Sequence, residues 1–364
     1  MSAGKKRLRS GFTTGACAAA AAKAACQHLL SGEPVRSVSI PFPDGQHFTF
    51  AVHDCFALGV DQAQASVIKD AGDDPDVTNG AEISVHLTVK SVPDGPPLTL
   101  SYAAGVGVGR VTKPGLAVAV GEPAINPGPR SMIEAALFEV LHDNQATGPV
   151  AITVTISIPR GQELATKTLN ERLGICGGLS ILGTTGIVRP VSAEAWTATI
   201  EASMAVAREC GCREIVLSTG RTSEKAVQEV LHLPVEAFAM MGDYLHFSLS
   251  AASRYGFQKI HLAGMWAKVL KAAMAIPQTH VRHGALEVKE AAALLGRLAA
   301  NQDLAASLES ANTAREIYDR LLAQNRQELI HAVCLAARRY AETVSERPVT
   351  VYLVASLGQV VCHV

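Results

Sequence analysis

The sequence predicts two folds in one chain: an α+β domain over residues 1–192 and an α/β domain with a mainly parallel sheet over residues 193–364. Strand-like segments are grouped together in the first half, whereas strand and helix patterns alternate from about residue 192 onward. Such alternation is typical of a parallel sheet with crossover helices. In a chain of 364 residues, 48% hydrophobic and 18% charged residues indicate a globular protein with enough apolar side chains for two cores.

The first predicted element is an alanine-rich helix that runs to about Ala25. Alanine is the strongest helix former, and Thr13 or Thr14 can cap the N-terminus. Free N–H groups and two hydroxyls at a helix start suit a carboxylate or phosphate ligand. Two alternatives stay open. One is an ordinary capped core helix; the other is a signal peptide, because basic residues precede the apolar run, although Lys23 interrupts it.

Alternating β-branched segments, separated by Pro, Asp and Gly turns, predict the strands of the first half. These are Val35–Ile40, Gln46–Val52, Ala65–Lys69, Glu82–Val89, Thr99–Tyr102 and Val150–Ile158. The stretch from 105 to 130 is too rich in Gly and Pro for a long helix, and an amphipathic helix is predicted over Ser131–His142.

In the second half the predicted strands are Glu214–Leu217, Ala237–Met241, Lys259–Leu262 and Thr350–Val354, the last joining the edge of the sheet. The predicted helices are Ser192–Cys210, Ser223–Leu231, Asp243–Tyr255 and Trp266–Ala275. Residues 286–345 are predicted to be helical, with Asn312 as a cap between two helices.

Composition excludes several classes of partner. The formal net charge is −1 and no long basic stripe is present, which argues against nucleic acid. Aromatic residues make up only 5%, too few for base-stacking platforms. The eight scattered cysteines do not form a four-ligand zinc pattern, so we expect free thiols in a reducing cytoplasm. No apolar stretch has membrane-spanning length, so no membrane partner is expected, and a homo-oligomer is left open.

The acidic segment Lys69–Thr78 has four carboxylates within seven residues. It allows three interpretations. The carboxylates hold Ca²⁺ or Mg²⁺, although the spacing is not that of a helix-loop-helix calcium site. Alternatively, they hydrogen-bond to the backbone of a turn. In the third, Asp70 binds a substrate N–H or accepts a proton while Lys69 balances its charge.

Two further glycine-rich stretches, 107–130 and 167–186, combine cations and hydroxyls. Lys113 and Arg130 are suited to pair with carboxylates, and thin, stiff Gly/Pro loops let backbone N–H groups face a ligand. Together with the acidic segment and the N-terminal motif, these stretches predict a groove for a large polyanionic ligand.

In the second half, two strands run into glycine-containing turns before helices, at Ser218–Ser223 and Leu262–Met265. Ligands of open α/β sheets bind at the carboxyl ends of strands, so these turns predict a cofactor site. His280 and His283 could form a metal-ligand pair, but no further ligand is evident and no protein-bound metal is predicted.

The chain resembles the CbiD family of cobalt-precorrin-5B C1-methyltransferases over nearly its whole length. The resemblance rests on long motifs: Gly11–Ala25, Lys69–Thr78, Gly107–Met132, Lys167–Pro190, Thr279-His280 and Ala311-Asn312-Thr313. It implies an α+β part and a Rossmann-like α/β part. It also implies methyl transfer from S-adenosylmethionine to carbon 1 of a ring-contracted cobalt-precorrin in cobalamin biosynthesis, with cobalt arriving inside the substrate.

The resemblance, together with the loops, suggests a role for each candidate residue. We expect Asp70 and His280 to act as catalytic proton acceptors. The expected cofactor-binding residues are Ser218, Thr219, Gly220, Gly264 and Lys268. The expected substrate-binding residues are Thr13, Thr14, Lys69, Lys113, Arg130, Lys167, Arg172, Thr184 and Thr185.

The chain departs from the family pattern in both cofactor loops. It has Ser218–Thr222 where the family usually has Pro-Gly-Asn-x-Gly, and Gly264–Lys268 where the family usually has Gly-His-x-Gly-Lys. Three alternatives therefore stay open: a non-catalytic tetrapyrrole-binding protein, a methyltransferase acting on a cobalt-free precorrin, and a phosphate-ligand enzyme holding Mg²⁺ at carboxylates 70–76.

Overall fold

The computed structural model describes residues 8–144, 148–190, 192–279 and 286–364. The chain divides into two compact units, unit 1 (Met1–Ser192) and unit 2 (Ala193–Val364). Each unit has its own hydrophobic core and is described by itself.

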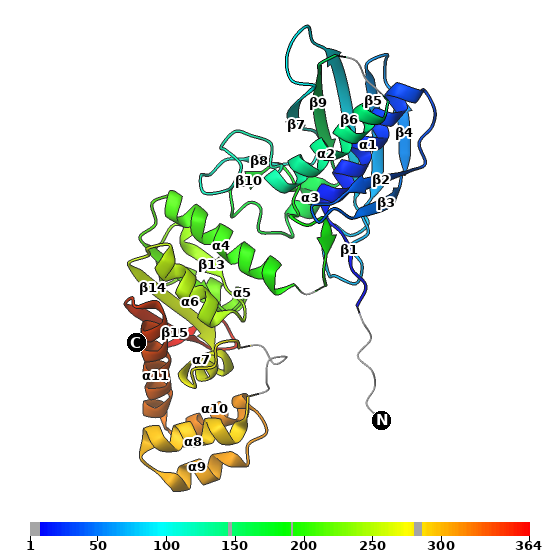
Figure 1. The fold of residues 1–364 in the computed structure, drawn as a ribbon. Helices are drawn as coiled ribbons and strands as arrows, with labels where there is room; N and C mark the ends of the chain where they lie inside the picture. The colour runs from blue at the N-terminus through cyan, green and yellow to red at the C-terminus, as the bar shows by residue number, and fades with distance from the viewer. Residues whose placement is uncertain (1–7, 145–147, 191, 280–285) are drawn as a thin grey trace, which may run out of the picture. The chain divides into compact units, whose positions relative to one another are not determined.

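Helix α1 (Thr14–Ser31) lies at the centre of unit 1, beside α2 (Pro127–Asp143) and against the sheet (Figure 1). All residues from Thr14 to Cys26 are buried. Alanine side chains are short enough to let the backbones of α1, α2 and the sheet approach closely on every side of the helix. The core-helix alternative therefore describes α1, and cleavage as a signal peptide would remove the centre of this core.

The main sheet of unit 1 has the strand order β4-β5-β6-β9-β7. All its neighbours are antiparallel except β7 and β9, which are parallel. Alternate residues such as Ala65, Val85 and Val154 are buried in the core. The strands are β4 (Asp54–Ala57), β5 (Gln62–Ile68), β6 (Glu82–Ser91), β7 (Leu98–Ala104) and β9 (Val150–Ser157).

Smaller elements complete unit 1. They are the hairpin β2 (Ser37–Pro41) and β3 (His47–Ala51), the pair β1 (Gly11–Phe12) and β11 (Ile187–Val188), the pair β8 (Arg110–Val111) and β10 (Ile175–Cys176), and α3 (Gly161–Ala165). The sequence did not predict β4. It placed the start of α2 too late, because Pro127 and Pro129 begin that helix instead of ending the preceding loop.

Unit 2 contains a five-stranded sheet of order β13-β12-β14-β15-β16, with β16 antiparallel to the rest. The predicted, mainly parallel sheet is therefore confirmed. Its strands are β12 (Glu214–Ser218), β13 (Phe238–Met240), β14 (Lys259–Met265), β15 (Val349–Val354) and β16 (Val360–His363). The prediction that β15 lies at the edge is wrong, because β16 turns back and occupies that edge.

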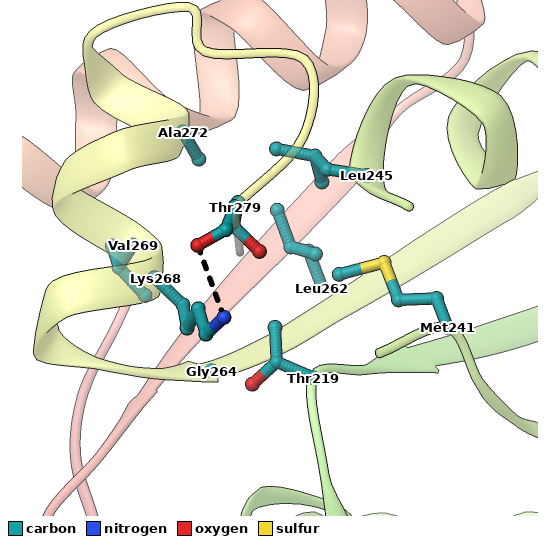
Figure 2. A pocket seen from close by; sticks show the side chains of 9 residues that line it. All are labelled: Thr219, Met241, Leu245, Leu262, Gly264, Lys268, Val269, Ala272 and Thr279. Carbon is teal, nitrogen blue, oxygen red and sulfur yellow. Dashed lines mark hydrogen bonds between the residues drawn. The ribbon is translucent and has the colours of Figure 1, made fainter. Parts of the chain in front are cut away.

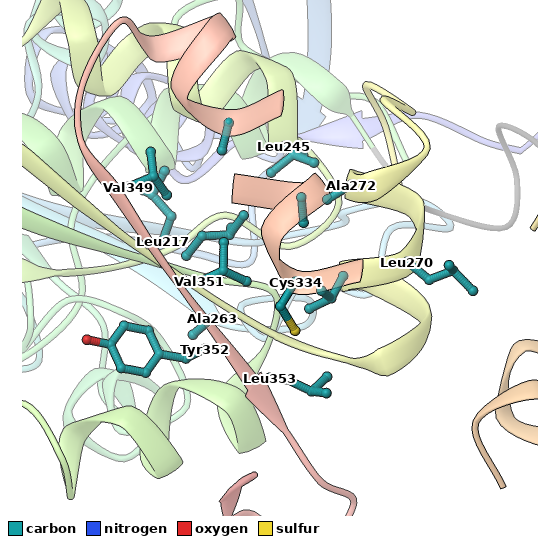
Figure 3. Packing of buried hydrophobic residues seen from close by; sticks show 14 of the residues in the cluster. Leu217, Leu245, Ala263, Leu270, Ala272, Cys334, Val349, Val351, Tyr352 and Leu353 are labelled. Atoms are coloured by element: carbon teal, nitrogen blue, oxygen red, sulfur yellow. The ribbon is translucent and has the colours of Figure 1, made fainter. Parts of the chain in front are cut away.

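The helices of unit 2 are α4 (Ala193–Glu209), α5 (Arg221–Gln228), α6 (Leu245–Arg254), α7 (Trp266–Ala273), α8 (Val288–Ala299), α9 (Gln302–Glu309), α10 (Ala314–Ala323) and α11 (Gln327–Ser345), with a 3₁₀ turn at Val235–Ala237. Helices α7 and α11 pack against each other and against β15. Figure 3 shows Leu217, Val351 and Leu353 of the sheet beside Cys334 of α11.

The predicted cap at Asn312 is displaced by one residue. Thr313 caps α10, and its hydroxyl accepts a hydrogen bond from the Glu316 backbone N–H at 3.1 Å. The Glu316 carboxylate in turn accepts from the backbone N–H of Asn312 at 2.8 Å. Thr313 therefore supplies the cap, and the Glu316 carboxylate holds the backbone of Asn312, the residue before it.

Candidate functional site

The carboxyl ends of β12 and β14 lie side by side in unit 2, and each leads into a helix N-terminus. Gly220 precedes α5 and Met265 precedes α7, and neither makes a side-chain cap hydrogen bond in the structure. Uncapped N-terminal N–H groups at adjacent strand ends favour a negatively charged group.

A small pocket opens at this edge (Figure 2). Its wall is mainly apolar, and Lys268, Thr219 and Thr279 supply polar groups. The lining residues are Thr219, Met241, Leu245, Leu262, Gly264, Lys268, Val269, Ala272 and Thr279. The cavity has a volume of about 10 Å³, roughly what one water molecule needs.

A polar cluster adjoins the pocket through Lys268 and Thr279, which line it. The Lys268 ammonium pairs with the Asp243 carboxylate and also donates to the Thr279 backbone carbonyl at 3.1 Å. Lys271 Nζ donates to the same carbonyl at 3.0 Å, and the Thr279 hydroxyl donates to Asp243 Oδ1 at 3.1 Å. Two lysines and one aspartate thus lie together at the Thr279 carbonyl and hydroxyl.

Burial and a neighbouring charge act together on Lys271. Its side chain is buried, and burial together with the Lys268 charge lowers its pKa from the ordinary value of 10.5, while Asp243 opposes this shift. An anion placed near the two lysines would relieve their mutual repulsion.

Only some of the predicted cofactor residues meet here. Thr219, Gly264 and Lys268 line the pocket together. Ser218 does not, because its fully buried hydroxyl donates to Glu224 at 3.0 Å. Gly220 lies in the adjoining turn, at the start of α5. His280 lies outside the described residues.

Sequence reasoning missed three members of this cluster: Asp243, Lys271 and Thr279. Asp243 follows β13, a strand that the sequence did predict, and neighbouring parallel strands end at one edge of a sheet. The position of Asp243 was therefore accessible from the pattern. The positions of Lys271 and Thr279 could not be predicted, because their distance from Asp243 depends on the path of the chain after α7.

In unit 1, Lys69 and Asp76 form a buried ion pair, with 2.6 Å between Lys69 Nζ and Asp76 Oδ2. The Lys69 side chain is only 1% exposed, which argues against its predicted contact with a substrate. Asp76 also accepts from the backbone N–H and the hydroxyl of Thr78, each at 2.7 Å. Burial raises the pKa of Asp76, but the Lys69 charge and these hydrogen bonds outweigh it, so the net shift is downward.

Asp70 is exposed and binds the Arg9 guanidinium through both carboxylate oxygens, at 2.5 and 2.8 Å. The Arg9 hydrogen bond and one from the Gly72 N–H lower the pKa of Asp70 to about 2. A carboxylate with so low a pKa is a weak base, which argues against its predicted role as proton acceptor. The hydrogen bonds of Asp70, Asp73 and Asp76 agree with the turn alternative for this segment.

The hydroxyls of the two N-terminal threonines form hydrogen bonds within the protein. Thr13 caps α1 through a hydrogen bond from the Ala16 N–H at 3.2 Å. The Thr14 hydroxyl donates to the Leu182 carbonyl at 3.3 Å and accepts from the Leu182 N–H at 3.0 Å. The Thr13 hydroxyl thus holds the start of α1, and the Thr14 hydroxyl joins α1 to the 182–186 loop, which argues against their predicted role in binding substrate.

The two glycine-rich stretches do lie together. Strands β8 and β10 pair, and further bridges join Val108 to Leu179 and Ile125 to Ile181. Lys113 Nζ donates to the Arg172 carbonyl at 3.2 Å.

The other predicted substrate residues lie on or near these loops. Arg130 stacks on the Tyr102 ring at 5.0 Å and donates to the Ile125 carbonyl at 2.9 Å. Lys167 is exposed, 3.9 Å from Glu163. Thr184 is exposed, and the exposed Thr185 hydroxyl bonds the backbone of Ile187 at 3.3 Å.

Comparison with known proteins decides the family. A family model described as CbiD matches residues 1–190, more than half of the chain. The chain belongs to the CbiD family. A second model, the CbiD C-terminal domain, matches residues 278–364. The resemblance predicted from the motifs is thus confirmed.

Curated CbiD relatives are similar over almost the whole chain. The chain is 55% identical to a protein of Desulfotalea psychrophila and 46% identical to one of Geotalea daltonii, covering 98% of this chain and of each relative. Both relatives are named cobalt-precorrin-5B C(1)-methyltransferase, that is, C-methyltransferases of cobalamin biosynthesis. A crystal structure of the cobalamin biosynthesis protein cbiD from Archaeoglobus fulgidus matches at 24% identity and a TM-score of 0.39, covering 87% of this chain and 85% of that chain.

Within the part of the chain that the structure describes, no helix is both long and apolar enough to cross a membrane.

Proposed function

We propose that this chain transfers a methyl group from S-adenosylmethionine to carbon 1 of cobalt-precorrin-5B, giving cobalt-precorrin-6A. The observation that supports this most is the 55% identity, over 98% of both chains, to a relative of that name. The reaction needs an electron-rich substrate carbon and a sulfonium leaving group, so the protein's task is to align them and exclude water.

We propose the edge of the unit 2 sheet as the cofactor site. The ammonium groups of Lys268 and Lys271, which meet at the Thr279 carbonyl, and the starts of α5 and α7 suit the carboxylate of the methyl donor. Asp243 suits its amino group, and Leu262 and Val269 offer apolar contact. A Rossmann-like arrangement of the parallel strands would place these groups at one edge. The 10 Å³ cavity is too small for a nucleoside, so we expect it to widen on binding.

We propose that the glycine-rich loops of unit 1 bind the acidic side chains of the macrocycle. Lys113, Arg130, Lys167 and Arg172 remain the candidates, with Thr184 and Thr185 as neutral donors. His280 remains a candidate proton acceptor, whereas the low pKa of Asp70 favours a structural role in holding Arg9.

Calorimetry with S-adenosylhomocysteine tests the cofactor site. Lys268→Met and Asp243→Asn are each expected to weaken binding at least about tenfold, equivalent to about 1.4 kcal/mol. The control is Lys225→Met, which removes an exposed lysine of α5 and should leave the affinity unchanged. Absence of binding by the wild-type chain, with or without the corrinoid, would refute the proposed site.

A labelled-methyl assay tests the reaction itself. We expect transfer to cobalt-precorrin-5B, and a Lys167→Ala variant with a raised KM and an unchanged kcat. Lys90→Ala, which removes an exposed lysine of β6, is the control. A shifted substrate absorption spectrum without methyl transfer would instead support the non-catalytic binding protein, and transfer only to the metal-free precorrin would identify the variant enzyme.

A further inference from the structure

Three potential metal ligands meet on the surface of unit 1, and none of them belongs to the sites described above. His53, Asp54 and Glu82 each offer one ligand atom, and all three atoms lie within 4.8 Å of one another. His53 Nε2 is 3.8 Å from Asp54 Oδ2. The His53 and Asp54 side chains are 51% and 62% exposed, so both can adjust to a ligand.

The register of β4 on β5 explains why the side chains of the consecutive residues His53 and Asp54 lie close together. Asp54 is the cross-strand partner of Ser66, yet the His53 N–H also donates to the Ser66 carbonyl at 2.8 Å. Two residues of one strand therefore oppose one residue of the next, as in a β-bulge, which re-aims a side chain. Ser66 pairs in turn with Ser84, so Glu82, two residues away on β6, is its diagonal neighbour.

Ser66 supplies an independent observation. It pairs directly with Asp54, has Glu82 as a diagonal neighbour on the same face of the sheet, and is only 1% exposed. Its hydroxyl oxygen is buried and has no hydrogen-bond partner among the described residues. A buried polar group without a partner is costly and calls for a functional explanation.

We propose that His53, Asp54 and Glu82 bind a divalent first-row transition metal, with the Ser66 hydroxyl donating to a ligating carboxylate. One imidazole and two carboxylates suit Mn²⁺ or Zn²⁺, and the two carboxylates balance the charge of the ion. Ligand atoms about 2.1 Å from a tetrahedral ion lie about 3.4 Å apart, so the present distances need only small side-chain rotations. Protein hydrogen bonds to ligating groups commonly orient them in this way.

The sequence predicted no protein-bound metal because the ligands do not share a local motif. His53 and Asp54 are 28 or more positions from Glu82, and no Cys or His spacing links them. Only the pairing of β4 with β5 and of β5 with β6 brings them together. The proposal of this metal site does not rest on the proposed methyl transfer.

Mn²⁺ titration of the full-length, chelator-treated chain, followed by the electron paramagnetic resonance signal of free Mn²⁺, tests the site. Mn²⁺ is the probe because the exposed thiols of Cys176 and Cys210 would compete for Zn²⁺. We expect one saturable equivalent, bound at least tenfold more weakly by His53→Ala and by Glu82→Gln. His142→Ala is the matched control, since His142 and Asp143 are also consecutive and exposed, 3.6 Å apart.

A Ser66→Ala variant separates metal binding from folding. Without metal its Tm should equal or exceed that of the wild type, because an unpartnered hydroxyl is removed. The rise in Tm on adding Mn²⁺ should be smaller than for the wild type. The proposal is overturned if the wild type binds no Mn²⁺, if His53→Ala binds as tightly as His142→Ala, or if Asp73→Asn alone abolishes binding, which would place the ion in the acidic segment.

Discussion

Removal of the Asp76 charge should destabilise unit 1 strongly. The Lys69 side chain is 1% exposed and Asp76 is 24% exposed, so Asp76→Asn removes the carboxylate that the buried ammonium contacts. Breaking one side of a buried pair costs about 3–5 kcal/mol, and the partial exposure of Asp76 places this case near 3 kcal/mol. If the free energy of unfolding falls by about 2 kcal/mol per M of urea, the urea concentration at the unfolding midpoint should drop by about 1.5 M.

Lys69→Met should lower the free energy of unfolding less than Asp76→Asn does. The Asp76 carboxylate that remains is partly exposed and keeps its hydrogen bonds from Thr78. This asymmetry is the sharper test, since both variants break the same pair. Asp70→Asn is the control, because the pair of Asp70 with Arg9 is exposed and should contribute little.

Far-UV circular dichroism in urea measures the unfolding of the whole chain. Both tryptophans, Trp196 and Trp266, lie in unit 2, so their fluorescence provides a reference transition within the same sample. We expect Asp76→Asn to move the dichroism transition and leave the tryptophan transition in place. A shift below about 0.3 M, or an equal loss from Lys69→Met, would refute the reasoning that a charged lysine is buried here.

Three further predictions follow from burial and backbone geometry. Burial lowers the pKa of His261 below its ordinary 6.5, so the unfolded state takes up the proton first. The free energy of unfolding of unit 2 should therefore be highest above about pH 6.5 and fall as the pH drops, and this fall should be larger in the wild type than in His261→Gln. Urea unfolding followed by tryptophan fluorescence measures it, and an equal pH dependence of the two proteins would contradict the prediction. Gly183→Ala should lower the Tm more than Gly148→Ala. Both glycines have a positive φ, but only at Gly183 would an added Cβ meet Thr13, the cap of α1, at 2.4 Å. Equal losses of Tm in the two variants would exclude that contact. Cys176 is exposed and should react with a thiol reagent at once. Burial raises the pKa of Cys17 to about 12, so Cys17 should react only when the protein unfolds. Prompt labelling of Cys17 would show that α1 opens in the folded protein.

Much of the candidate cofactor site could be predicted because parallel strands impose a common geometry. Thr219 follows β12, Gly264 lies near the end of β14 and Lys268 lies in the first turn of α7, and the carboxyl ends of parallel strands meet at one edge. Ser218 was assigned to the same turn, but a one-residue difference in position directs its hydroxyl into the interior, toward Glu224. Residue type indicated a polar turn, and only the register decided which hydroxyl faces the pocket.

The sequence by itself determined the elements whose stability is local. The alanine run and the Thr13 cap specify α1, and the alternation of strands and helices specifies the parallel sheet of unit 2. These depend on backbone propensity and on periodicity within a few turns or strands, which a single sequence displays directly.

Tertiary structure alone decided which polar groups are buried and which groups meet. It placed β16 at the sheet edge, buried Lys69 against Asp76, and brought His53, Asp54 and Glu82 around Ser66. Residue type does not reveal these outcomes, because the cost of burying a charge or hydroxyl depends on partners that long-range strand pairing supplies.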